Sequence, residues 1–188
     1  EIAPFGGQIQ KTADRLLTLN NETIRLSELD ATTQDVVLET VDLYQAAENC
    51  MDTLEISAQK HDVTLKLEGV PCKIRTEKGM ADEVIYNLCD NAIRYNNKGG
   101  SVTISVLPVA NQVVLSVKDT GIGISKEHQE RIFERFYRVD KSRSKSTGGT
   151  GLGLAIVKHI VARNGARMEL TSEVGKGTEI KIYFDKAA

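Results

Sequence analysis

The chain has 188 residues, of which 40% are hydrophobic and 27% are charged, and so it can bury a core in one domain with an appendage or in two small domains. A net charge of −2 and a pI of about 6.0 give no sign of a surface for polyanions. Aromatic residues make up 5% and tryptophan is absent, which argues against a platform for single-stranded nucleic acid. We therefore expect no nucleic-acid partner, and any contact with phosphate must come from a local arrangement of residues.

The cysteines are Cys50, Cys72 and Cys89, an odd number without CxxC spacing. This pattern favours reduced, buried thiols in a cytoplasmic compartment over a zinc site or a disulfide framework. No apolar run reaches the length needed to cross a bilayer, and no signal peptide opens the chain. Because the first residue is Glu1 and not methionine, we expect a piece of a longer protein.

The N-terminal part predicts one separate helix over residues 8–30, where apolar residues recur at helical spacing with charges between them. Its narrow apolar stripe must be buried on another helix, either in this chain or in a partner, and packing on its own domain remains an alternative. A polar linker over residues 31–34 then indicates a domain boundary. We expect one unit over residues 1–33 and a second over residues 34–188.

The rest of the chain alternates between helix and strand patterns. Helices are predicted over residues 43–60, 77–95, 127–137 and 152–164. Strands are predicted over residues 36–40, 63–67, 72–75, 102–107, 113–118, 168–172 and 178–184, with 63–67 and 72–75 forming a hairpin. Paired strands with helices between them, without a regular βαβ repeat, favour a two-layer α/β sandwich preceded by the N-terminal helix. We expect a mixed, mostly antiparallel sheet with three helices on one face.

A glycine-rich segment, GGTGLGL, stands at residues 148–154 directly before a predicted helix. Gly149, Gly151 and Gly153 allow the backbone to approach an anion closely, and the free N–H groups of a helix start point toward it. No Gly-Lys-Ser/Thr ending follows, which excludes a P-loop, and a basic loop stands where a dinucleotide fingerprint needs a strand. Taken alone, the segment fits either a phosphate site or a flexible hinge.

Two further patterns carry polar groups suited to a nucleotide. Asp119 opens DTGIG at the end of a predicted strand, where a carboxylate can accept a hydrogen bond from an exocyclic amine. A plain turn is the alternative, because Asp-x-Gly is common turn chemistry. Asn87 and Asn91 are four residues apart and face the same way on one helix, and amide oxygens can complete the coordination of a Mg²⁺ held by phosphates. Caps on neighbouring loops are the alternative for either asparagine.

Phe133 and Phe136 stand at helical spacing, which is typical of core anchors. A basic run follows them, which is usually a solvated face. Since this run leads into the glycine-rich segment, a lid that closes over phosphates is the alternative.

Taken in order, these segments resemble the signature boxes of the sensor histidine kinase catalytic domain. Residues 82–95 (DEVIYNLCDNAIRY) resemble the N box, and residues 131–140 (RIFERFYRVD) resemble the F box. The three glycine boxes correspond to DTGIG at 119–123, GTGLGL at 149–154 and GKGT at 175–178. The resemblance covers residues 36–184 and implies the fold shared by histidine kinases, type II topoisomerases, Hsp90 chaperones and mismatch-repair ATPases.

The resemblance also implies ATP and Mg²⁺ as ligands, with a role for each matched position. Asp119 would bind the adenine amino group with support from Thr178, while Asn87 and Asn91 would lie near Mg²⁺ and the phosphates. Arg94 would supply a cation where many relatives carry lysine, and would act with Asn87 in catalysis. Gly149, Gly151 and Gly153 would wrap the phosphates. The remaining positions that the boxes place against the nucleotide are Tyr95, Gly121, Gly123, Phe133, Arg138, Thr150 and Leu152. Residues 133–147 would form a mobile lid, with residues 142–149 poorly ordered when no nucleotide is bound.

The same comparison favours phosphate transfer over hydrolysis. Relatives that hydrolyse ATP carry a glutamate as general base one helical turn before the conserved asparagine, whereas this chain has Asn87, which cannot abstract a proton. In the histidine kinase family, the nucleophile that attacks the γ-phosphate is a histidine side chain. None of His61, His128 and His159 lies in the sequence context of that family's phosphoacceptor histidine. Residues 8–30 resemble the second helix of the family's dimerisation hairpin.

We therefore expect an ATP-binding fragment that cannot phosphorylate itself by the usual route. Its partners would be the phosphoacceptor hairpin of a homodimeric, membrane-anchored parent and a response regulator. A nucleotide-binding regulator, or an anti-sigma-type serine kinase of the same fold, is the alternative.

Overall fold

A computed structural model of the protein describes residues 3–31, 37–139 and 149–187. Its main sheet has five strands in the order β2-β4-β5-β7-β6. The strands are β2 (Val63–Gly69), β4 (Gly100–Val109), β5 (Gln112–Asp119), β6 (Arg167–Glu173) and β7 (Gly177–Asp185). Only β2 and β4 run parallel, and the other neighbours are antiparallel, which confirms the predicted mixed, mostly antiparallel sheet.

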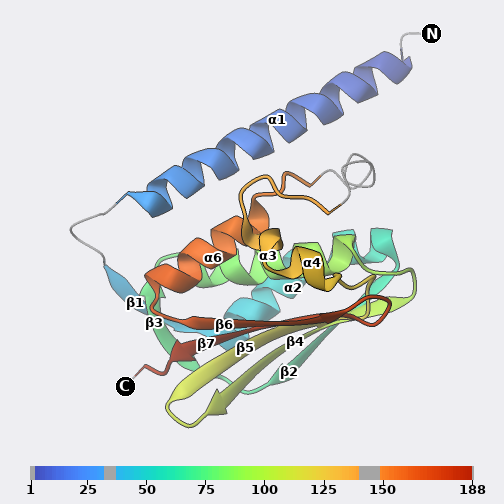
Figure 1. The fold of residues 1–188 in the computed structure, drawn as a ribbon. Helices are drawn as coiled ribbons and strands as arrows, with labels where there is room; N and C mark the ends of the chain where they lie inside the picture. The colour runs from blue at the N-terminus through green and yellow to red at the C-terminus, as the bar shows by residue number, and fades with distance from the viewer. Residues whose placement is uncertain (1–2, 32–36, 140–148, 188) are drawn as a thin grey trace.

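Three helices cover one face of this sheet (Figure 1): α2 (Leu43–His61), α3 (Met80–Arg94) and α6 (Gly153–Arg163). The strands turn alternate residues toward them, as at Val102, Ile104 and Val106, which are buried while their neighbours are not. The core lies between the two layers, because both the apolar strand face and the apolar helix stripes are removed from water there. The predicted two-layer sandwich is confirmed.

Helix α1 (Ala3–Asp30) lies across this sandwich and contacts α6 near its C-terminal end (Figure 1). Leu26 and Leu29 are 2% and 8% exposed, whereas the more N-terminal Leu16 and Leu17 are 60% and 62% exposed. The apolar stripe is therefore buried on this chain only over the last turns of the helix. Within the described residues, no helix is both long and apolar enough to cross a membrane.

The predicted hairpin of residues 63–67 and 72–75 is wrong. Strand β2 pairs with β4, and β3 (Lys73–Glu77) pairs with β1 (Leu38–Asp42) in a separate two-stranded sheet. The N–H of Val70 donates to the carbonyl oxygen of Val106 at 3.1 Å, which keeps the chain on β4 beyond the end of β2. Pro71 then has no N–H to donate, so a tight turn back onto β2 is not supported. The alternation of apolar and polar residues predicted the strands β2 and β3 but not the strands with which they pair.

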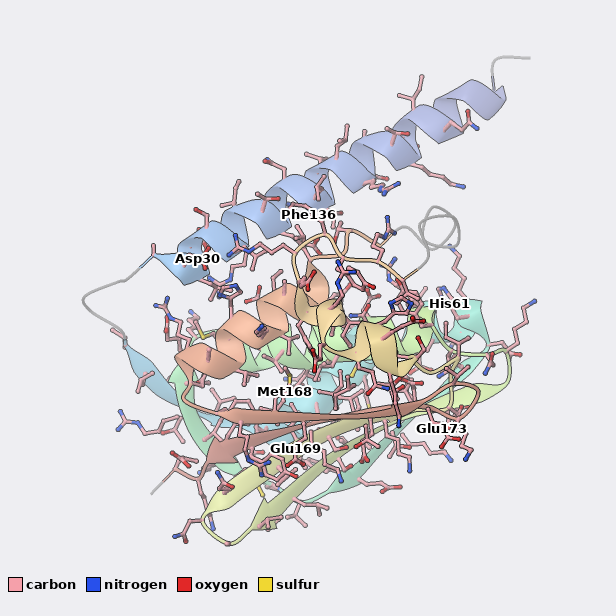
Figure 2. All side chains as sticks on the ribbon, in the orientation of Figure 1. Asp30, His61, Phe136, Met168, Glu169 and Glu173 are labelled. Carbon is pink, nitrogen blue, oxygen red and sulfur yellow. The ribbon has the colours of Figure 1, made fainter. Side chains whose placement is uncertain are left out.

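The predicted helix over residues 127–137 is also largely wrong. Only α4 (Lys126–Gln129) and the 3₁₀ helix η1 (Arg131–Phe133) form. Phe136 has a φ of 64°, and its N–H donates to the carbonyl oxygen of Gly151 at 3.0 Å, which draws the chain away from a helical path. Phe133 packs against the core, but Phe136 is 57% exposed and is not a core anchor. Figure 2 shows Phe136 on the segment that faces α1. Most of the predicted lid, and nearly all of the segment expected to be poorly ordered, lies at residues 140–148, outside the described residues.

Candidate nucleotide-binding site

A cavity of about 400 Å³ lies among helix α3, the facing ends of β5 and β7, and the start of α6. This volume is in the range of small-molecule sites. Most of the predicted site residues line it: Asn87, Asn91, Arg94, Tyr95, Asp119, Gly123, Arg138, Gly149, Thr150, Gly151, Gly153 and Thr178. Three predicted residues, Gly121, Phe133 and Leu152, do not line it. Leu152 is fully buried in the core. Phe133 is partly buried and packs against the core.

The floor of the cavity comes from the sheet. Val117 and Ile180 are cross-strand partners on β5 and β7, and both line the cavity. Each lies two residues from a polar lining residue, Asp119 or Thr178, so that floor and polar groups share one face of the sheet. Further apolar walls come from Leu88, Ile122, Ile124, Ile132 and Leu154. An apolar cavity floor with a few polar groups at one end suits a planar ring.

The Asp119 carboxyl is held by backbone donors. Its Oδ1 accepts the N–H of Gly121 at 2.8 Å and the N–H of Thr178 at 3.2 Å. No described residue donates to Oδ2, which leaves that oxygen available as an acceptor in the cavity. Burial raises the pKa of this carboxyl, and the two N–H donors act in the opposite direction by stabilising its charged form.

Ser172, which no sequence pattern pointed to, positions this end of the site from β6. Its Oγ lies 2.8 Å from the Thr178 Oγ1, accepts the N–H of Ile124 at 2.9 Å and lies 3.0 Å from the Gly177 carbonyl oxygen. Ser172 and Thr178 are register partners, so a correct pairing of the last two strands would have brought them together. At Gly177 φ is 103°, and a Cβ there would stand 2.0 Å from the Asp119 carbonyl oxygen. Glycine is therefore required where the third glycine box approaches the first.

The asparagine face of α3 meets the start of α6. The Nδ2 of Asn87 donates to the Glu83 carbonyl oxygen at 2.8 Å, one turn earlier, and this fixes its amide. A Cβ on Gly153 would stand 2.8 Å from Asn87 Oδ1 and 3.8 Å from Asn91 Nδ2. The absence of a side chain at Gly153 thus lets the second glycine box lie directly on the N box. Both asparagines face the cavity side of α3, as their spacing predicts.

Cationic and aromatic groups surround the glycine loop. A Cβ at Gly149 would stand 3.7 Å from Arg138 Nη2 and 3.8 Å from the Tyr95 hydroxyl. Arg94 Nε lies 2.6 Å from Asp90 Oδ2, one turn away on the same helix. Burial lowers the pKa of the Arg138 guanidinium, but a guanidinium remains charged at any physiological pH. Two guanidinium groups therefore border this part of the cavity, and one of them, that of Arg94, is paired with Asp90.

Helix α1 also reaches the cavity, which the sequence analysis did not foresee. Thr18 and Glu22 are among the lining residues, and the Thr150 hydroxyl donates to Glu22 Oε2. Burial raises the pKa of the Glu22 carboxyl, while the Thr150 hydrogen bond and the charge of Arg94 act to lower it. Helical spacing places these two residues on one face of α1, but nothing in the sequence says what that face touches.

The family model described as "Histidine kinase-, DNA gyrase B-, and HSP90-like ATPase" matches residues 76–188. The match covers more than half of the chain and contains the cavity's sheet floor, the N box and all three glycine boxes. The chain belongs to this family. The predicted ATP-binding catalytic domain of the sensor histidine kinase type is thereby confirmed.

Curated relatives of the chain carry sensor kinase names. The sensor-like histidine kinase SenX3 of Mycolicibacterium smegmatis is 35% identical over 96% of this chain and 47% of its own length. The phosphate regulon sensor protein PhoR of Pseudomonas aeruginosa is 34% identical over 96% of this chain and 41% of its own length. The chain thus spans less than half of the length of these relatives, and both are similar to it from the N-terminal helix onward.

Solved structures agree with the fold of this ATPase family. Full-length ShkA, solved in complex with AMPPNP, superposes with a TM-score of 0.83 at 25% identity, over 99% of this chain and 39% of that one. The Acinetobacter baumannii histidine kinase AdeS gives a TM-score of 0.80 at 21% identity, over 100% of this chain and 86% of that one. The second likeness supports the arrangement of the elements and nothing more specific.

None of the described residues that line the cavity is a histidine. His61 Nδ1 lies 2.8 Å from the Ser57 carbonyl oxygen at the end of α2, and His128 Nδ1 lies 2.6 Å from the Tyr137 hydroxyl. His159 Nδ1 lies 3.3 Å from Asp30 Oδ1, at the C-terminal end of α1 (Figure 2). Each histidine therefore has a local packing or hydrogen-bonding role in this member of the family.

Proposed function

We propose that this chain binds Mg²⁺-ATP and donates its γ-phosphate to a histidine on another segment of a sensor kinase, for relay to a response regulator. The observation that supports this proposal most directly concerns Asn87 on α3. Its amide donates to the Glu83 carbonyl oxygen and lies against the glycine loop. In relatives that hydrolyse ATP, a general base is needed at this position. An amide can orient a phosphate or a metal ligand, but it cannot activate a water.

The adenine ring would lie on the cavity floor over Val117 and Ile180. Its amino group would donate to Asp119 Oδ2, the carboxyl oxygen that accepts no hydrogen bond from a described residue. Thr178 would support this contact from β7, since its N–H already holds the other oxygen of the same carboxyl. Gly121 would act on Asp119 through its N–H without lining the cavity.

The triphosphate would lie between α3 and the glycine loop. N–H groups at the start of α6 favour negative charge, and Gly149, Gly151 and Gly153 allow close approach. Arg94, Arg138 and Tyr95 border this end of the cavity. Asn87 and Asn91 fit Mg²⁺, because amide oxygens are hard ligands that can complete a shell supplied mainly by phosphates and water. The ion would neutralise charge on the transferred group.

The rest of the parent protein is part of the proposal. Residues 1–33 would be the second helix of a dimerisation and phosphoacceptor hairpin, and residues 34–188 the catalytic domain. The exposed Ile9, Leu16 and Leu17 support this assignment, since such a row needs a partner helix. A homodimeric, membrane-anchored parent belongs to the same proposal and follows from the resemblance to sensor histidine kinases.

An ATP titration in the presence of Mg²⁺ tests the nucleotide site. Asp119→Asn places an amide donor where an acceptor is needed, and it should weaken binding by at least about tenfold, as loss of a charged hydrogen-bond acceptor does. Asp185→Asn, at the exposed end of β7, is the matched control and should bind as wild type does. Failure of the wild-type chain to bind ATP at millimolar concentration would contradict the proposal.

Phosphate transfer is tested by adding a two-helix hairpin that carries an acceptor histidine. We expect acid-labile, base-stable phosphate on the hairpin, since a phosphoramidate behaves in this way, and little free phosphate in its absence. Acid-stable phosphate would favour the serine kinase alternative. Steady hydrolysis without the hairpin would show that Asn87 does not prevent attack by water.

A further inference from the structure

Tyr137 lines the cavity but was not among the predicted nucleotide contacts. Its side chain is half-buried and stands directly before Arg138, which borders the glycine loop. An aromatic ring on a cavity wall offers a large contact area to a ligand. This area contributes most to affinity when the ring is already held in one orientation before the ligand binds.

The hydroxyl group of Tyr137 is held by His128, which lies outside the cavity on α4. Nδ1 of His128 lies 2.6 Å from the Tyr137 hydroxyl oxygen, which is a short hydrogen bond. The other ring nitrogen, Nε2, lies 3.6 Å from Glu127 Oε1, and this carboxylate favours a proton on Nε2. In the neutral ring, Nδ1 is then the acceptor and the tyrosine hydroxyl is the donor.

One face of the Tyr137 ring is covered by Arg131. The guanidinium carbon lies 4.2 Å from the ring centroid, in the geometry of a cation–π contact. Glu134 in turn holds this guanidinium, with 3.4 Å between Arg131 Nη2 and Glu134 Oε2. Because the hydroxyl is held at one end and one face is covered, rotation of the ring is restricted. The cavity therefore meets the ring in one orientation.

Helix α4 is itself fixed to the proposed adenine end of the cavity. Gln129 follows His128 on this helix. Its Nε2 donates to the carbonyl oxygens of Ile124 at 2.8 Å and Ser172 at 3.0 Å. Ile124 lines the cavity, and the Ser172 hydroxyl lies 2.8 Å from that of Thr178. The position of His128 is thus set by the same residues that surround the proposed adenine contact.

We propose that Tyr137 contacts the bound nucleotide and that His128 is the residue that positions it for this contact. The inference rests on the proposed ATP site and adds to it a pair of residues from the wall and from behind the wall. A side chain that is ordered in advance avoids the entropy loss of ordering on binding, which amounts to about tenfold or less in affinity for one side chain. Without His128, the ring samples several orientations and the nucleotide must select one of them.

The pair is tested without nucleotide, through the NMR signals of the imidazole nitrogens in mildly alkaline buffer. His128 should carry its proton on Nε2, and its Nδ1 should give the signal of a hydrogen-bonded acceptor. Tyr137→Phe removes the donor and should shift the His128 Nδ1 signal, while the signals of His61 and His159 stay in place. Unchanged His128 signals in this variant would overturn the pairing.

The positioning role is tested by a double-mutant cycle on the affinity for Mg²⁺-ATP. Tyr137→Phe and His128→Leu should each weaken binding by about fivefold, since each removes one side of the same hydrogen bond. The double variant should also lose about fivefold and not the product of the two, because the residues act as a unit. His128→Asn should bind as wild type does, since its amide oxygen takes the place of Nδ1, whereas leucine has the same shape without an acceptor. Tyr137→Ala removes the ring as well and should weaken binding further than Tyr137→Phe.

Tyr183→Phe is the matched control for the loss of a tyrosine hydroxyl. This hydroxyl donates to Glu169 at 2.7 Å, and Tyr183 does not line the cavity, so the affinity for ATP should not change. Losses that multiply in the double variant, or a His128→Asn variant as weak as His128→Leu, would overturn the positioning role. Equal affinities of Tyr137→Ala and Tyr137→Phe would overturn the contact of the ring with the nucleotide. A wild-type chain that binds no ATP would contradict the proposed function and this contact together, whereas the nitrogen signals test the pair by itself.

Discussion

At the scale of single residues, the carboxyl of Asp119 lies half-buried against the N–H groups of Gly121 and Thr178. Burial raises its pKa, so the folded chain holds the proton more firmly than the unfolded chain does. Its favourable contribution to stability is therefore present below the ordinary pKa of an aspartate and is lost as pH rises through the raised value. Nucleotide binding needs the opposite, an ionised acceptor, and so stability and binding compete at this residue.

This competition predicts that Asp119→Asn is more stable than wild type near neutral pH, even though it binds ATP poorly. The reason is that the amide avoids the cost of burying a charge. Urea unfolding of both chains without nucleotide should show the difference at pH 7 and little difference below the pKa of the carboxyl. A variant that is less stable than wild type at pH 7 would indicate that the backbone donors outweigh burial.

Ser172 carries the second prediction at this scale. Ser172→Ala removes the hydroxyl that joins Ile124, Thr178 and Gly177, which costs about 1 kcal/mol or about fivefold in ATP affinity through misplacement of the adenine end. Thr171→Ala, at the exposed neighbouring position of β6, is the control and should have no such effect. Isothermal titration of both variants with ATP measures the difference, and equal affinities would show that the network is not needed for binding.

At the scale of elements, sequence periodicity predicted every major helix and all seven strands of the described residues, but not all of the strand partners. Alternation identifies which face of β2 or β3 is buried, yet both strands satisfy it equally well with partners far along the chain. The helical pattern over residues 127–137 does not include the tertiary contacts of this segment, such as the hydrogen bond from the Phe136 N–H to the Gly151 carbonyl oxygen. Motif spacing brought most of the site together correctly, whereas Ser172 and Glu22 depend on strand register and helix docking, which local patterns do not encode.

Docking of α1 places a carboxylate at the phosphate end of the cavity, which leads to a prediction about Glu22. Since like charges repel and are only partly screened in a half-buried site, Glu22→Gln should increase ATP affinity by several-fold, on the order of 1 kcal/mol. The glutamine retains an oxygen for the Thr150 hydroxyl. Glu28→Gln, on the exposed face of the same helix, is the control for the loss of charge alone. Tighter binding in both variants, or in neither, would argue against a local effect.

At the scale of the whole molecule, α1 contacts the rest of the chain through both polar and apolar side chains. Arg25 forms an ion pair with Glu83 at the start of α3, and Arg163 of α6 donates to the Leu29 carbonyl oxygen. The Arg25 and Glu83 side chains are 31% and 23% exposed, so solvent partly screens this pair, and we expect most of the docking free energy to come from burial of Leu26 and Leu29. We therefore hypothesise that the helix is held separately from the sandwich, in which case its release would also remove Glu22 from the cavity.

Leu26→Ala tests this view of the molecule. Truncating a buried leucine costs about 2–5 kcal/mol. If α1 is held separately, that loss should appear as faster hydrogen exchange in α1, with the exchange of β4 and β5 unchanged. Leu17→Ala, at a position 62% exposed on the same helix, is the matched control and should leave both unchanged. Because release of α1 withdraws Glu22, Leu26→Ala should also bind ATP more tightly. Faster exchange throughout the sheet would instead show that α1 and the sandwich unfold as one cooperative unit.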